Sequence, residues 1–181
     1  YFELENIKRK INGFKNKNAA DKILARYYAA KSQLFLFKQG NNKYLQLSLQ
    51  YKLKSLFSSE RAKDYLLVIR NLIHLARIYR LLGEYDNAVK IIKKGQHYSK
   101  IINNEDMFSM FEILSIELDF NRDKSAAQKY YLSCIKLHKK LTTESSFECV
   151  QTVNFKLILV TSFLDKENEI KFYEREYVRS L

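Results

Sequence analysis

Residues 72–95 read LIHLARIYRLLGEYDNAVKIIKKG, and this stretch decides how the chain folds. Before Gly83, large apolar residues recur three and four positions apart, which is the spacing of one face of a helix. A second helical pattern follows Gly83 and carries small residues at Ala88 and Gly95, where two helix axes can approach closely. The stretch therefore predicts two helices joined by a turn at Gly83.

The same landmarks recur 39 residues further along the chain, counted from Leu72 to Phe111. Leu72, Leu75, Ala76, Tyr79, Ala88, Ile92 and Gly95 correspond to Phe111, Leu114, Ser115, Leu118, Ala127, Tyr131 and Cys134. Large residues stay large and small residues stay small, and only the turn glycine changes, to Arg122. One helical hairpin cannot bury its apolar face alone, so a repeat of this kind predicts stacked neighbours.

This pattern resembles the tetratricopeptide repeat, a helix–turn–helix unit of about 34 residues. The resemblance implies an all-α fold, a right-handed superhelical solenoid of about four antiparallel helix pairs. We expect the pairs at about 20–57, 60–102, 107–141 and 147–179, after an N-terminal capping helix at 2–12. Ser58 and Ser59 are expected to cap the second pair. We expect a single domain over 1–181 and, because the chain begins at Tyr1 rather than Met, a fragment lacking an N-terminal domain.

Composition agrees with a helical chain. There is no Pro, the residue that breaks helix interiors, although a codon bias towards Lys, Asn, Ile and Tyr would also deplete it. The net charge of +12 suits nucleic acid, an anionic membrane or an acidic peptide as partner. The Lys residues are spread along every segment, which is also what a solvated helix exterior gives.

Several kinds of chemistry are missing from the sequence. His74, His97 and His138 are far apart and show no metal-ligand spacing, and we expect His74 to pack between helices. There is no phosphate-binding loop and no nucleophile elbow, so we expect no enzyme activity, no catalytic residue, no metal and no cofactor. Two Cys, no apolar run long enough to span a membrane and no signal peptide favour a reduced, cytoplasmic location without a membrane partner.

In a tetratricopeptide solenoid the first helix of each pair lines the concave face. The residues that the resemblance places in a peptide-binding groove are Arg70, Asn71, Ile73, Arg77 and Arg80, with Glu112 and Asp119 on the next pair and Tyr27, Leu34 and Phe37 on the previous one. Arg has a planar fork that suits a carboxylate, including a peptide C-terminus. Asn71 and Asn154 could grip a peptide backbone. Alternatively, Glu112 and Asp119 simply neutralise the Arg stripe.

Loose repeats, long aromatic-rich helices and a Lys-, Asn- and Ile-rich composition also resemble the C-terminal domains of peptide-pheromone receptors of the Rgg, PlcR and Rap type from Gram-positive bacteria. This resemblance implies a quorum-sensing sensor domain that binds a short peptide, forms a homodimer and reaches DNA only through a missing N-terminal helix-turn-helix domain. The alternative is a protein–protein interaction scaffold without a regulatory ligand. Direct nucleic-acid binding through the charge is a third hypothesis.

Overall fold

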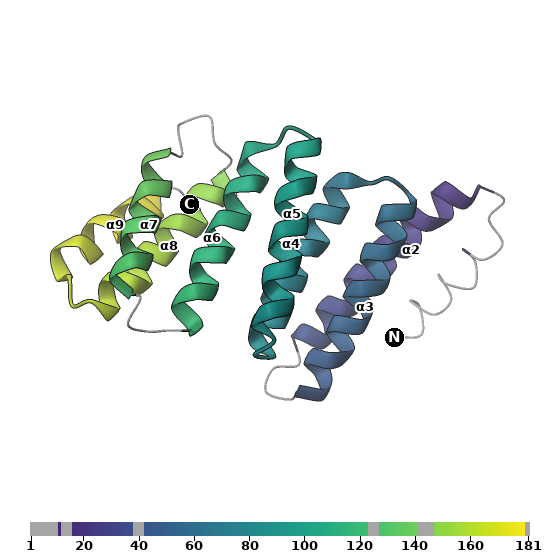
Figure 1. Ribbon diagram of the computed structural model, residues 1–181, viewed down its shortest axis with the longest axis horizontal. Helices are drawn as coiled ribbons and strands as arrows, with labels where there is room; N and C mark the ends of the chain where they lie inside the picture. Colours follow the sequence, from purple (N-terminus) through teal and green to yellow (C-terminus); the bar gives the residue numbers. More distant parts are fainter. Residues whose placement is uncertain (1–10, 12–15, 38–41, 123–126, 141–146, 180–181) are drawn as a thin grey trace. The chain divides into compact units, whose positions relative to one another are not determined.

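The computed structural model describes residues 11, 16–37, 42–122, 127–140 and 147–179, and every regular element in these ranges is a helix. The helices are α2 (Lys17–Leu36), α3 (Asn42–Arg61), α4 (Tyr65–Leu81), α5 (Tyr85–Ile101), α6 (Glu105–Arg122), α7 (Ala127–Lys140), α8 (Phe147–Phe163) and α9 (Glu167–Arg179) (Figure 1). The all-α prediction is confirmed for this part of the chain. The chain divides into two compact units, Tyr1–Ile102 and Asn103–Leu181, and we call them unit 1 and unit 2.

In unit 1 each helix packs against the next one along the chain, α2 on α3, α3 on α4 and α4 on α5. Buried serines mediate the contact of α2 with α3. The hydroxyls of Ser32 and Ser48 lie 2.9 Å apart, and the Ser55 hydroxyl donates to the carbonyl of Ala25 at 2.7 Å. A serine is small and its hydroxyl can bond to a backbone carbonyl, so helices can meet closely without an unsatisfied polar group.

The core of unit 1 is centred on α4, as the repeat pattern predicts. Leu72 and Leu75 are fully buried, and burying each such side chain contributes about 1.5–3 kcal/mol. The small residues Ala76, Ala88 and Gly95 are buried as well. Small and large residues therefore occupy the buried positions that the sequence assigns to them.

In four of the described turns between helices, one residue has a positive φ angle. Lys63, Gly83, Asn103 and Asp165 have φ angles of 54°, 75°, 51° and 54°, in the left-handed region. After Gly83 the amide of Glu84 bonds to the carbonyl of Tyr79 at 2.9 Å, which completes the usual hydrogen-bond pattern of a helix end. The predicted turn at Gly83 is confirmed.

The predicted N-caps at Ser58 and Ser59 are wrong. Helix α3 continues to Arg61, and both serines are buried inside it. The Ser59 hydroxyl donates to the carbonyl of Leu56 at 2.8 Å. The cap of α4 is Asp64, whose carboxylate accepts from the amide of Leu67 at 3.2 Å.

In unit 2, α6 packs on α7, α7 on α8 and α8 on α9, and α6 also contacts α8. Its core contains the predicted landmarks Phe111, Leu114, Leu118, Ala127, Tyr131 and Cys134. Ser115, which corresponds to the buried Ala76, is half-buried. The predicted helix at 2–12, apart from the buried helical Ile11, and the predicted turn at Gly40 lie outside the described residues.

Candidate functional site

Helix α4 carries most of the predicted site. Arg70 is exposed, and Arg77 and Arg80 are half-buried. Ile73 lies on the same helix but is only 8% exposed, so it belongs to the core. The structure therefore places the arginines, and not the isoleucine, where a ligand could reach them.

The exposed side of α4 is a line of two leucines and two arginines. Leu66 is 56% exposed and Leu81 is 53% exposed, and Arg70 and Arg77 lie between them. Steps of four, seven and four residues keep these side chains on one side of a helix. We call these four residues the α4 line. Residues 65–83 contain no Asp or Glu, so no carboxylate on this helix neutralises the line.

Asn71 and Asn154 are not on the surface, since each is 1% exposed. The Asn71 amide donates to the Ser59 hydroxyl at 3.3 Å and so links α4 to α3. Within the described residues, Oδ1 of Asn154 on α8 is buried without a hydrogen-bond partner. Burial keeps both side chains from a peptide backbone that binds at the surface.

The remaining predicted residues are on other helices. Tyr27 on α2 is buried, whereas Leu34 on the same helix and Phe37, its C-cap, are 49% and 81% exposed. Glu112 and Asp119 belong to unit 2, where Glu112 is half-buried and Asp119 is exposed. Asp119 borders a hollow of about 20 Å³ between α6 and α7, which holds no more than a water molecule.

Sequence reasoning missed one buried charge on α3, the helix that packs against α4. Lys52 on α3 is only 2% exposed, and burial lowers its pKa to about 8. It lies close enough to His74 on α4 to act on it electrostatically. Burial, with the charges of Lys52 and Arg77, lowers the pKa of His74 to about 4. At neutral pH the histidine is therefore neutral, and the lysine and arginine are positively charged.

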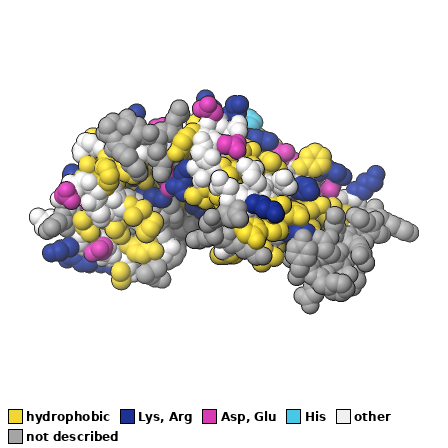
Figure 2. Space-filling model, turned by 90° about the horizontal axis from the view of Figure 1, so that it is seen from below, with side chains coloured by type: hydrophobic (Ala, Val, Ile, Leu, Met, Phe, Trp, Pro, Cys, Tyr) yellow, Lys and Arg dark blue, Asp and Glu magenta, His cyan; other side chains and the backbone are white. Residues whose placement is uncertain are grey.

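Lys52 and Arg77 both act electrostatically on His74, and we call these three residues the basic cluster. Arg77 is also a member of the α4 line. Figure 2 shows that, on the face in view, Lys and Arg side chains lie among hydrophobic ones. The cluster can attract and hold an anionic group, while the leucines of the α4 line can contact apolar groups.

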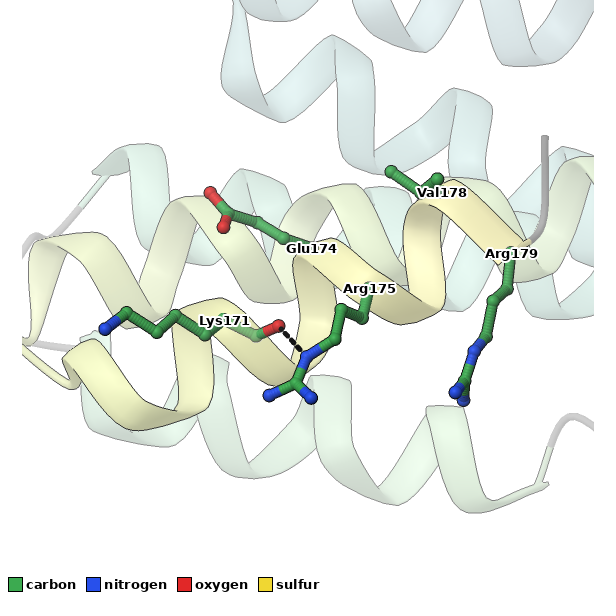
Figure 3. Close-up of a pocket in the computed structure, with 5 residues that line it drawn as sticks. All are labelled: Lys171, Glu174, Arg175, Val178 and Arg179. Carbon is green, nitrogen blue, oxygen red and sulfur yellow. Dashed lines mark hydrogen bonds between the residues drawn. The ribbon is translucent and has the colours of Figure 1, made fainter.

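A hollow of about 540 Å³ on α9 is a weaker candidate (Figure 3). All five residues that line it, Lys171, Glu174, Arg175, Val178 and Arg179, come from this one helix. Nε of Arg175 donates to the carbonyl of Lys171 at 3.1 Å, so part of its hydrogen-bonding capacity is used locally. One helix cannot enclose a ligand, and this surface remains open.

Two further searches of the described residues bear on function. No group of three or more His, Cys, Asp or Glu side chains comes together there as a metal site would require. None of the described helices has the length and apolarity needed to cross a membrane.

Comparison with known proteins adds no family to this picture. No protein-family model matches the chain, and no curated protein matches it either.

Proposed function

We propose that the chain is a helical-repeat domain that binds an extended peptide or protein segment along the exposed side of α4. The main evidence for this proposal is the α4 line. Two positive charges between two exposed leucines suit a ligand that has an acidic group and apolar residues on either side. No carboxylate on α4 competes for the arginines.

The proposed architecture is a solenoid of antiparallel helix pairs. The register of α2 and α3 supports this, because Ser32 bonds to Ser48 while the earlier Ala25 bonds to the later Ser55. Regular turns support it as well, since Lys63, Gly83 and Asn103 are spaced twenty residues apart and share one conformation. In a solenoid of this kind, exposed lines on successive helices form an extended binding surface.

The narrower proposal is a sensor of a signalling peptide that controls a transcription regulator. It rests on the resemblance described above. A sensor must bind its ligand unequally in two conformations, whereas a scaffold need not. Hydrogen exchange of the complex therefore distinguishes them: a sensor shows altered protection on helices away from α4, and a scaffold shows it only at the contact.

Binding of a synthetic library of short peptides tests the proposal. We expect retained peptides to combine apolar residues with an acidic side chain or a free C-terminus. Replacing Arg70 and Arg77 by Ala should reduce their affinity at least about tenfold, the loss of roughly 1.4 kcal/mol. The melting temperature should change little, because Arg70 is exposed and Arg77 half-buried.

The matched control is the double replacement of Lys90 and Lys93, two exposed lysines of α5, by Ala. It removes the same net charge and should leave affinity unchanged. If both double variants weaken binding equally, overall charge attracts the ligand and the α4 line has no specific role. If the wild-type chain retains no peptide but binds single-stranded DNA with a steep dependence on salt, the nucleic-acid hypothesis replaces this proposal.

A further inference from the structure

The buried side of α3 carries a row of polar residues beside Leu49 and Leu56. Ser48, Lys52, Ser55 and Ser59 follow one another at steps of four, three and four residues, and all are buried. The three hydroxyls bond to Ser32, to the Ala25 carbonyl and to the Leu56 carbonyl. Lys52 is the exception: within the described part of the chain its ammonium has no hydrogen bond and no ion pair, and the side chain, 2% exposed, keeps only a small contact with solvent.

The described helices around Lys52 carry few carboxylates, and none of these forms an ion pair with Lys52. No Asp or Glu occurs between Asp21 and Glu60, or between Asp64 and Glu84. Each of these four acidic residues is engaged elsewhere. Asp21 pairs with Arg61, Glu60 with Lys94, Asp64 caps α4, and Glu84 accepts from Asn87.

A second buried lysine in the same hairpin shows what a satisfied ammonium looks like. Lys31 on α2 is 3% exposed. Its ammonium donates to the Tyr27 hydroxyl at 3.2 Å and lies 4.7 Å from the centre of the Tyr51 ring. Hydrogen bonding and a cation–π contact offset part of the cost of burying that charge. Lys52 has neither contact.

A buried charge without a partner costs free energy, so an anion supplied from outside would stabilise the protein. We propose that Lys52 receives one carboxylate of the bound ligand, an acidic side chain or a C-terminus. This assignment rests on the proposed function of the α4 line, and it names the group that the ligand must carry. A carboxylate is favoured over a phosphate because a single negative charge costs less to bury than the nearly double charge of phosphate.

The experiment measures the melting temperature of the full chain in increasing sodium acetate, sodium phosphate or sodium chloride at equal ionic strength. Acetate is the carboxylate probe, and it requires no peptide. Acetate should raise the melting temperature by about 2 °C or more above chloride, through binding to the folded state alone. This shift should vanish in Lys52→Met and persist in Lys54→Met, a control at an exposed lysine of the same helix.

Three results would overturn the proposal: no difference between acetate and chloride, an equal acetate effect in Lys52→Met, or a larger Lys52-dependent effect of phosphate. If Lys52→Met does not fold, NMR of the wild-type chain labelled with ¹³C at lysine Cε decides. Acetate must then raise the pKa of Lys52 and leave that of Lys54 unchanged. Because no peptide is used, failure here leaves the proposed peptide binding intact, and failure of the peptide library leaves this result intact.

Discussion

Both units bury charged side chains, and Glu117 of unit 2 and Lys52 of unit 1 differ in how the fold neutralises their charge. In unit 2, Glu117 is 6% exposed and its carboxylate lies 2.6 Å from the ammonium of Lys156, which joins α6 to α8. In unit 1, Lys52 is 2% exposed, and the described carboxylates of α2 and α3, Asp21 and Glu60, pair with Arg61 and Lys94 instead. The first charge is neutralised within the fold, so its role is structural. The charge of Lys52 is not neutralised within the described fold, and we propose that a ligand carboxylate neutralises it. The contrast therefore favours unit 1 as the unit that binds the ligand.

Removing one partner of the Glu117–Lys156 pair should give the largest loss in the free energy of unfolding. Glu117→Ala leaves Lys156 without its partner while its side chain is only 16% exposed, and we expect a loss of about 3–5 kcal/mol in the free energy of unfolding. Urea denaturation measures this loss.

The double replacement Glu117→Leu with Lys156→Met is the control for that pair. It removes both charges and should recover most of the stability, because two apolar side chains of similar size need no desolvation of ions. If Glu117→Ala costs less than about 1 kcal/mol, the pair behaves as a surface ion pair and the contrast between the units is lost.

Raising the pH should change the free energy of unfolding by a smaller amount, through the deprotonation of Lys52 in unit 1. The folded pKa of Lys52 is about 8 and its ordinary value is 10.5. Between these values the unfolded chain holds a proton that the folded chain has released, so stability rises with pH. Below pH 8 the lysine is charged in both states and the full cost of burial remains.

From pH 7.5 to 9.5 the wild-type chain should therefore gain about 2 kcal/mol relative to Lys52→Met, as measured by urea denaturation. Taking the difference between the two chains removes the contributions of other groups, such as the Cys134 thiol, whose pKa burial raises to about 12. Lys54→Met should follow the wild-type curve. If the unfolding free energies of wild type and Lys52→Met change with pH in parallel, burial does not lower the pKa of Lys52, and this prediction is wrong.

Much of the fold is predictable from residues 72–95 and their repeat. Gly83 marks the turn because glycine adopts a positive φ without strain, and the small residues Ala76, Ala88 and Gly95 mark positions that the structure buries. The arginines of α4 are predictable as a stripe because helical spacing depends only on residue number.

The burial of Lys52 could not be predicted, because its local sequence looks like that of an exposed lysine. In YKLKSLFSS, Lys52 and Lys54 are alike in type and surroundings, yet one is buried and the other exposed. What separates them is the contact of α3 with α2 and α4, which involves residues far apart in sequence. For the same reason Ser58 and Ser59 suggest a helix start, although the tertiary contacts of α3 keep them inside a helix.

The most direct test is to measure, at pH 7, both the unfolding free energy of Lys52→Met and its affinity for a peptide selected by the wild-type chain. If Lys52 is retained for binding at a cost in stability, the variant is more stable than wild type and binds the peptide at least about tenfold more weakly. A variant that is less stable, or that binds with wild-type affinity, contradicts the account.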